Sequence, residues 1–248
     1  MVLGKAGAGK TVLALELLIQ LLEERRRDPA GPVPVLISAV AVDTRTPFET
    51  WLAGHLARRF GLNEADTADL VRRRRILPVL DGLDEMDAEH ASERASALVN
   101  ALNAYMLGRD RAPVVATCRP REYRRLPEAL DRATHVELVP MGGHGSAAYL
   151  REQLRDEDDL RRCAPVLEAL EDDPGGLVAE ELATPWRLTL ALTVFLNDGD
   201  PAALLPGPSA DAAAYRNEVN ALLLDQYVPA VVRLRDPNGR YPAEKVAS

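Results

Sequence analysis

A short stretch near the start of the chain has the residue types and spacing of a loop that binds phosphate groups. Residues 4–11 read Gly-Lys-Ala-Gly-Ala-Gly-Lys-Thr, which follows the pattern Gly-x-x-x-x-Gly-Lys-Thr. Small residues let such a loop turn its backbone N–H groups inward around phosphate oxygens, and the following helix points its positive end at the anion. We therefore expect nucleotide contacts along the whole loop, from Gly4, Lys5, Ala6, Gly7, Ala8, Gly9, Lys10 and Thr11.

The last two residues of this loop have separate chemical roles. The ammonium of Lys10 can reach the β- and γ-phosphates of a nucleoside triphosphate, and the hydroxyl of Thr11 can bind Mg²⁺. A turn rich in Gly and Ala between a strand and a helix can also be purely structural. Here an apolar lead-in before the loop and a strongly helical run after it favour the nucleotide site.

Acidic residues follow an apolar run at residues 76–80, which reads as a buried strand. Asp81 comes directly after this run, and a carboxylate in that place can bind Mg²⁺ together with Thr11. Asp84 and Glu85 follow, and either can orient or deprotonate a water that attacks the γ-phosphate. The same two acids can instead cap the next helix, and both roles can coexist.

Arg119 comes soon after another predicted strand, at residues 113–117. A guanidinium at that edge can reach the γ-phosphate and distinguish a triphosphate from a diphosphate. The alternative is a surface arginine in a Cys-Arg-Pro turn. Asp43, which follows the predicted strand at residues 33–42, is a weaker candidate and suits a turn or helix cap better.

These residues need a scaffold that brings strand ends to one edge, and the rest of the sequence predicts one. Apolar runs alternate with helical patterns, the strands at residues 33–42, 76–80, 113–117 and 135–139 and the helices at residues 10–27, 48–60, 63–75 and 88–107. This alternation predicts an α/β fold in which a parallel sheet has helices on both faces. Ligands of such sheets bind at the carboxyl ends of the strands, where the acids and the arginine lie.

Two helices in this scheme carry further expectations. The first helix is apolar on nearly every face, which predicts burial against the sheet and a neighbouring element. Another helix ends in four arginines at residues 72–75, and this run reads as a solvated helix end rather than a nucleic-acid surface.

Beyond about residue 142 the pattern changes to helices broken by Pro and Gly. We therefore expect a nucleotide-binding core at residues 1–140 and an all-helical subdomain at residues 141–235. Residues 236–248 contain a turn and what reads as a linker or the opening of a further element. Only three residues precede Gly4, fewer than a central strand usually has, so we expect a chain that begins inside a larger protein or has a misplaced start.

Composition and charge narrow the possible functions. The 248 residues include 38 acidic and 30 basic side chains, and the net charge of −8 argues against nucleic-acid binding as the main task. The longest apolar run, at residues 12–22, is too short to span a bilayer, so no membrane partner is expected. Cys118 and Cys163 lie in no metal-ligand pattern, and a reduced, cytoplasmic setting is expected.

Three motifs together resemble those of the NACHT domain, which belongs to the signal-transduction ATPases with numerous domains. They are the loop at residues 4–11, Leu-Pro-Val-Leu-Asp-Gly-Leu-Asp-Glu at residues 77–85 and Val-Ala-Thr-Cys-Arg-Pro at residues 115–120. The loop and Asp81 would be the Walker A and Walker B motifs, and Asp-Gly-Leu-Asp-Glu is the most specific element. A further segment at residues 183–190 is similar to the family's proline-containing helical segment, which implies that Pro185 lies against the nucleotide base.

The resemblance implies an ATP-driven signalling switch. Its ADP form would be closed, ATP would open it for self-association, and slow hydrolysis would reset it. The implied cofactors are ATP or ADP with Mg²⁺, and the implied partners are further copies of the module and effector and sensor domains on a longer chain. A winged-helix region would begin near Tyr241. The alternatives are a conventional turnover ATPase or P-loop kinase, and a truncated fragment that binds nucleotide weakly.

Overall fold

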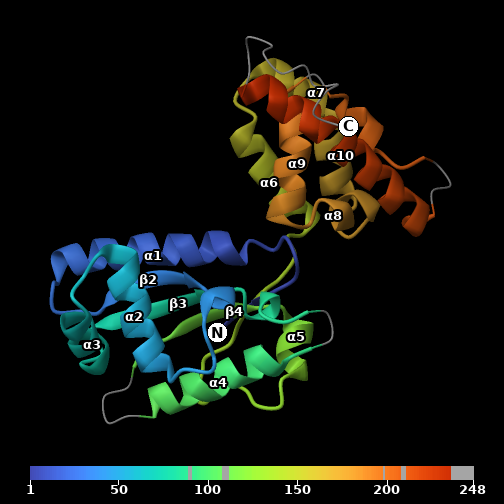
Figure 1. Cartoon of the computed structure of the whole chain (residues 1–248). Coiled ribbons are helices and arrows are strands. Elements are labelled where there is room, and N and C mark those ends of the chain that lie inside the picture. The colour runs from blue at the N-terminus through green and yellow to red at the C-terminus, as the bar shows by residue number, and fades with distance from the viewer. Residues whose placement is uncertain (89–90, 108–111, 198, 208–210, 236–248) are drawn as a thin grey trace. The chain divides into compact units, whose positions relative to one another are not determined.

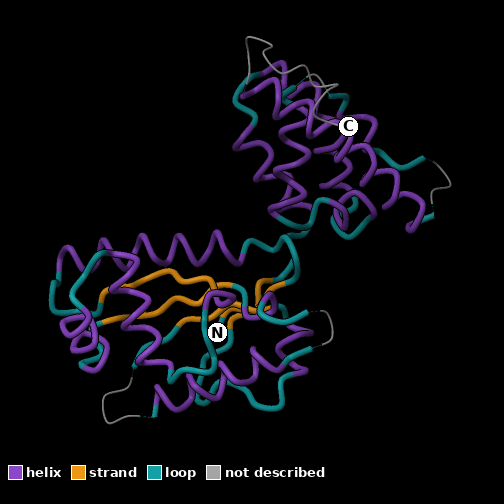
Figure 2. Tube along the Cα trace, in the orientation of Figure 1, coloured by secondary structure: helices purple, strands orange, loops and turns teal. Residues whose placement is uncertain are grey.

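The computed structural model describes residues 1–88, 91–107, 112–197, 199–207 and 211–235. The chain divides into two compact units, one from Met1 to Leu138 and one that begins at Val139. Figure 1 labels the helices and strands, and Figure 2 shows that the described strands belong to the first unit. The linker or winged-helix region expected at residues 236–248 lies outside the described residues.

A five-stranded sheet forms the centre of the first unit. Its strands are β1 (Val2–Gly4), β2 (Val33–Ser38), β3 (Ile76–Asp81), β4 (Val115–Cys118) and β5 (Val136–Leu138). They lie in the order β2-β3-β4-β1-β5, and each neighbouring pair is parallel. This arrangement confirms the predicted parallel α/β fold, and it brings the carboxyl ends of all five strands to one edge.

The side chains of β3 explain why the sheet is covered on both faces. Successive side chains of a strand point to opposite faces. Ile76 and Leu80 pack into the large core on one side, whereas Leu77 and Val79 pack into a smaller cluster on the other. The strand therefore reads as a continuous apolar run, as expected of a parallel strand that is buried on both faces.

Helices flank this sheet on both faces, as predicted. Helix α1 (Lys10–Arg27) lies along one face, and α2 (Phe48–Phe60) and α4 (Glu93–Met106) lie along the other (Figure 1). Helix α3 (Glu64–Arg72) packs beside α2, and α5 (Pro120–Arg125) follows β4. The main core lies on the side of α2 and α4, where the buried leucines include Leu52, Leu56, Leu98 and Leu102.

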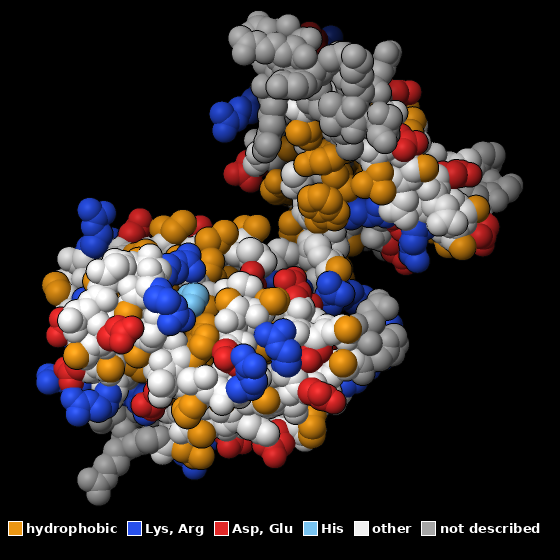
Figure 3. Space-filling view, viewed as in Figure 1, with side chains coloured by type: hydrophobic (Ala, Val, Ile, Leu, Met, Phe, Trp, Pro, Cys, Tyr) orange, Lys and Arg blue, Asp and Glu red, His pale blue; other side chains and the backbone are white. Residues whose placement is uncertain are grey.

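The first helix is less buried than its sequence suggests. Among its described residues only Ala14 is buried, while Val12 is 68% exposed and Ile19 is 50% exposed. The cluster beneath the helix is small. In the described part of the chain its buried members are Ala14, Leu77 and Val79, and Leu21, Leu36 and Val115 are partly buried against them. The expectation of burial on nearly every face is therefore wrong, and hydrophobic side chains lie at the surface along α1 (Figure 3).

The run of four arginines is not simply a solvated helix end. Helix α3 ends at Arg72, and Arg74 has a left-handed φ of 56° where the chain turns toward β3. The guanidinium of Arg74 lies over the ring of Tyr105 in α4, 4.2 Å from its centroid, and it pairs with Glu49 of α2 at 2.6 Å. This arginine therefore ties α2 and α4 to the turn before β3. The prediction of a solvated run holds for Arg72 and Arg73, which are exposed, and is wrong for Arg74.

Strand β2 ends earlier than predicted, and its pairing with β3 explains why. The strand stops at Ser38, whose parallel partner is Asp81, the last residue of β3. Beyond this pair β3 offers no further ladder partner, and Ala39–Ala41 form a 3₁₀ turn, η1. The predicted strand at residues 33–42 is therefore a strand followed by a turn at the functional edge of the sheet.

The second unit is built from helices, as predicted. They are α6 (Gly143–Gln153), α7 (Glu157–Asp172), α8 (Leu177–Glu181), α9 (Pro185–Phe195) and α10 (Ala212–Arg235), with the 3₁₀ turn η3 (Pro201–Leu204) before α10. Their core is apolar and includes Leu150, Val166, Leu188 and Phe195. Across the described ranges, no helix has both the length and the hydropathy needed to cross a membrane.

A buried carboxylate joins three helices of this unit. Glu181, at the end of α8, is 5% exposed and pairs with the guanidinium groups of Arg187 on α9 and Arg216 on α10. The distance from Arg216 Nε to Glu181 Oε1 is 2.7 Å, and Arg187 also donates to Asn220 of α10. Two guanidinium groups thus compensate one buried charge, which a carboxylate in an apolar interior requires.

Removing Glu181 should destabilise the second unit strongly. The variant Glu181→Ala leaves the largely buried guanidinium of Arg187 without its carboxylate, and breaking a buried ion pair costs about 3–5 kcal/mol. The neighbouring Glu180 is 57% exposed and lies 3.8 Å from Arg216, so Glu180→Ala should cost less than about 1 kcal/mol. Urea unfolding followed by circular dichroism compares the two free energies, and equal losses would contradict the importance of the buried pair.

Candidate functional site

The predicted phosphate loop lies between β1 and α1. Gly4 ends the strand, Lys10 begins the helix, and Gly9 has a φ of 89°, a left-handed conformation that glycine adopts without strain. In the described part of the chain no side chain caps the start of α1. Because the first N–H groups of a helix have no partner within it, those at the start of α1 remain available to an anion.

The side chain of Lys10 folds back over this loop. Its Nζ donates to the carbonyl oxygens of Gly4 and Lys5, at 3.0 and 3.3 Å. Hydrogen bonds from an ammonium to phosphate oxygens are stronger than those to neutral carbonyl groups. The ammonium is thus held close to the loop by weak acceptors that a phosphate group can replace.

The oxygens of Thr11 and Asp81 meet at the same edge of the sheet. Thr11 Oγ1 donates a hydrogen bond of 2.7 Å to Asp81 Oδ2. Mg²⁺ prefers oxygen ligands of this kind, and two adjacent ligands of an octahedral Mg²⁺ lie about 2.9 Å apart. Within the described ranges no group of three or more His, Cys, Asp or Glu could hold a metal ion by itself. The pair therefore fits a Mg²⁺ ion that takes its other ligands from phosphate and water.

Thr117, which is not among the site residues predicted from the sequence, contacts the same carboxylate. Its Oγ1 lies 2.6 Å from Asp81 Oδ1 and accepts a hydrogen bond of 2.9 Å from the backbone N–H of Gly82. Ala116 of β4 is paired with Leu80 of β3, so Thr117 follows at the level of Asp81. The available signal in the sequence is a hydroxyl residue near the end of a strand, but only the strand order places it beside the acid.

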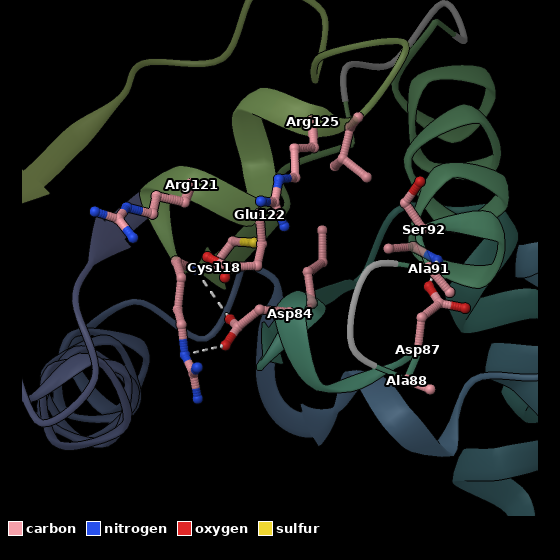
Figure 4. A pocket seen from close by; sticks show the side chains of 13 residues that line it. Asp84, Asp87, Ala88, Ala91, Ser92, Cys118, Arg121, Glu122 and Arg125 are labelled. Carbon is pink, nitrogen blue, oxygen red and sulfur yellow. Dashed lines mark hydrogen bonds and ion pairs between the residues drawn. The ribbon is translucent and has the colours of Figure 1, made fainter.

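Asp84 and Arg119 form an ion pair at the ends of β3 and β4. The carboxylate of Asp84 accepts a hydrogen bond of 3.0 Å from the backbone N–H of Arg119, and its other oxygen lies 2.8 Å from Arg119 Nε (Figure 4). The Asp84 side chain is 2% exposed, whereas that of Arg119 is 45% exposed. The structure thus brings two predicted site residues together, and both carboxylate oxygens of Asp84 are occupied by contacts with Arg119.

Glu85 lies on the solvent side of the same turn. Its side chain is exposed, and it lies against Gly82, where an added Cβ would be 3.1 Å from the carboxyl carbon of Glu85. Gly82 has a φ of 82°, a left-handed conformation in which a residue with a side chain would be strained. The turn after Asp81 therefore directs its two following acids differently, Asp84 inward to the arginine and Glu85 outward to solvent.

The helix that follows these acids is capped by a third acid. The carboxylate of Asp87 accepts hydrogen bonds from the backbone N–H groups of Arg94 and Ala95, at 3.0 and 2.9 Å. These groups lie in the first turn of α4, where N–H groups need acceptors from outside the helix. The alternative role of Asp84 and Glu85 as helix caps is therefore filled by Asp87.

A cavity of about 290 Å³ lies beside the Asp84–Arg119 pair, between the turn after β3, the start of α4 and α5 (Figure 4). Side chains of both charges line it, among them Asp87, Arg121 and Glu122. None of its lining residues belongs to the phosphate loop. The cavity gives the ion pair free space on the side of α4 and α5.

Cys118 lies in this region but is unsuited to nucleophilic chemistry. The thiol is buried, and burial, with a further contribution from the charge of Asp84, raises the pKa of Cys118 to about 12. At neutral pH the side chain is therefore a protonated thiol, whereas the thiolate is the nucleophile. Cys118 acts as a small apolar side chain next to the ion pair.

Two other candidates have local contacts of their own. Pro185 occupies the first turn of α9 in the second unit, where Thr184 caps the helix through the N–H of Arg187. Its contact with the nucleotide base stays a prediction. Asp43 accepts hydrogen bonds from the backbone N–H and the guanidinium of Arg45, at 3.1 and 2.8 Å, which is the turn-capping role expected of it.

Replacing Lys10 should weaken nucleotide binding far more than replacing Lys5. Lys10→Ala removes the ammonium that lies over the loop, and a single charge-assisted contact of about 3 kcal/mol corresponds to more than a hundredfold in Kd. Lys5 is an exposed loop residue whose expected contribution is through its backbone, so Lys5→Ala should change Kd by less than about fivefold. Isothermal titration calorimetry with ATP measures both variants, and a similar loss in both would contradict the separate role of Lys10.

Similarity to known families agrees with this geometry. The model of the NACHT domain matches residues 1–157, which is more than half of the chain. No curated protein sequence is similar enough to the chain to be matched. The matched range includes the phosphate loop, the acids after β3 and Arg119, and NACHT domains are P-loop NTPases, which implies nucleotide binding. The chain therefore belongs to the NACHT domain family.

Proposed function

We propose that this chain is the ATP-binding and slowly hydrolysing module of a signalling switch, in which the bound nucleotide controls conformation and self-association. Membership of the NACHT family supplies nucleotide binding as the starting point. The nucleotides of the two states are ATP and ADP, each with Mg²⁺. Effector and sensor domains belong to a longer chain in this proposal, and the protein works in the cytoplasm without a membrane partner or a nucleic-acid ligand.

The pairing of Arg119 with Asp84 is the observation that carries this proposal. Leu3 of β1 is paired with Cys118 of β4, so Arg119 follows at the level of Gly4, where the phosphate loop begins. A γ-phosphate bound at this loop would offer the guanidinium an acceptor with more negative charge than one carboxylate. Triphosphate and diphosphate therefore differ in their ability to draw Arg119 away from Asp84.

The burial of Asp84 makes this competition matter for conformation. A carboxylate that is 2% exposed is strongly disfavoured when its cation leaves, because water cannot replace the lost interaction. The turn that carries Asp84 must then rearrange, and the adjacent cavity gives it room to do so. A ligand shifts a conformational equilibrium only through its different affinity for the two states, and the γ-phosphate supplies that difference here.

For hydrolysis we propose Glu85 as the residue that orients the attacking water. Asp84 has both carboxylate oxygens engaged with Arg119, whereas Glu85 is exposed at the same edge of the sheet. Thr11 and Asp81 would hold Mg²⁺, which would neutralise charge on the β- and γ-phosphates. Lys10 and the N–H groups of the loop bind the phosphates in this arrangement, and a weakly activated water keeps turnover slow.

Glu85→Gln should reduce ATP hydrolysis by about 100-fold, because the amide cannot accept a proton as the carboxylate does. The affinity for ATP should change by less than about threefold, since Glu85 does not belong to the phosphate loop. The matched control is Glu122→Gln, which alters an acid that lines the cavity beside the ion pair. Single-turnover release of phosphate measures each rate, and an unchanged rate in Glu85→Gln would show that another group orients the water.

Arg119→Ala should abolish the difference between ATP and ADP. In the unaltered chain we expect a larger assembly with a non-hydrolysable ATP analogue than with ADP, as measured by light scattering after gel filtration. The variant should give the same mass with both nucleotides, because the group that senses the γ-phosphate is gone. Arg121→Ala, at a neighbouring position on α5, should retain the difference. If the unaltered chain has one mass with both nucleotides, the switch proposal fails.

A further inference from the structure

The hydroxyl of Thr117 makes two hydrogen bonds whose directions are fixed by chemistry. The side chain is fully buried, at 0% exposure, and its Oγ1 lies within hydrogen-bond distance of Gly82 N and Asp81 Oδ1. A backbone N–H can only donate, so the hydroxyl oxygen accepts from Gly82. The single hydroxyl proton is therefore free for Asp81, and the Thr117 hydroxyl donates it to Oδ1.

This donation fixes the orientation of the Asp81 carboxylate. One oxygen, Oδ1, is held by Thr117 at 2.6 Å, and the other, Oδ2, receives the hydroxyl of Thr11 at 2.7 Å. A carboxylate with one oxygen fixed from β4 presents its second oxygen in one direction only. That direction is toward Thr11, the residue with which it would share Mg²⁺.

The same hydroxyl also secures the turn after β3. The N–H of Gly82 is buried at this contact and would lose its acceptor if Thr117 became valine, which has the same shape without the oxygen. Serine keeps the oxygen and loses only a methyl group. The two substitutions therefore separate the hydroxyl from the volume of the side chain.

We propose that Thr117 is a positioning residue for metal-dependent nucleotide binding, acting only through Asp81. It touches neither the nucleotide nor the metal in this proposal, and it aims the free oxygen of Asp81 at the metal position. The inference rests on the proposed Mg²⁺ role of Thr11 and Asp81 and adds the group that holds them in register. Residues that orient a metal ligand typically contribute about 10–100-fold to metal affinity.

The test measures the affinity for a non-hydrolysable ATP analogue at increasing Mg²⁺ concentrations, and also in EDTA. In EDTA, Thr117→Val should bind the analogue within about threefold of the unaltered chain, because the phosphate loop is intact. Mg²⁺ should raise the affinity for the analogue, and the Mg²⁺ concentration that gives half of this increase should be about 10–100-fold higher in Thr117→Val than in the unaltered chain. In Thr117→Ser it should lie within about threefold of the value for the unaltered chain. If the valine variant does not fold, Thr117→Ala takes its place in the same comparison.

A double-mutant cycle with Asp81→Asn tests whether Thr117 acts through that residue. Asp81→Asn alone should reduce the increase in analogue affinity that Mg²⁺ produces, and adding Thr117→Val should reduce this increase no further. Additive losses in the double variant would overturn the inference. So would an equal dependence on Mg²⁺ in Thr117→Val and the unaltered chain, or an equal loss of Mg²⁺ dependence in Thr117→Val and Thr117→Ser. The readout is binding alone, so failure of hydrolysis or assembly would refute the proposed switch and leave this result standing.

Discussion

The position of β4 between β3 and β1 is the constraint on which the rest of the site depends. Parallel pairing on both sides of β4 sets its carboxyl end level with Asp81 on one side and with the start of the phosphate loop on the other. From that end, Thr117 reaches the first acid and Arg119 reaches Asp84. Residues more than 30 positions apart in sequence thus share one edge, and a change in either neighbouring strand would misalign the others.

The acids that follow β3 differ in burial and in the groups that they contact. The carboxylate of Asp84 is almost fully removed from water and is therefore useful only while a cation compensates it. Glu85 remains in solvent, where its charge needs no fixed partner, and in the proposed mechanism it orients the attacking water. Asp87 is engaged with the N–H groups of α4, which joins the turn to that helix. Three acids within four residues thus have three environments, and their chemistry follows from these rather than from residue type.

Local sequence patterns predict the parts of the fold that depend on neighbouring residues. The phosphate loop, the strand before Asp81 and the end of α2 at Phe60 follow from residue type and spacing alone. These patterns do not predict the hydrogen bonds of Thr117 or the ion pair of Asp84, because these depend on the order of the strands and on the turn at Gly82. The interaction of Arg74 with Tyr105 was missed for a similar reason, since it joins segments that only the folded chain brings together.

The light packing of α1 links the local stability of this face of the sheet to the occupancy of the site. A layer that rests on a cluster as small as Ala14, Leu77 and Val79 opens at a lower free energy than the opposite face, with its many buried leucines. Lys10 and Thr11 begin this same layer. A ligand held at its first turn, present at 100 times its Kd, would add about 2.7 kcal/mol against any opening that releases it. Bound phosphate would thus stabilise the thinly packed face of the sheet against local opening.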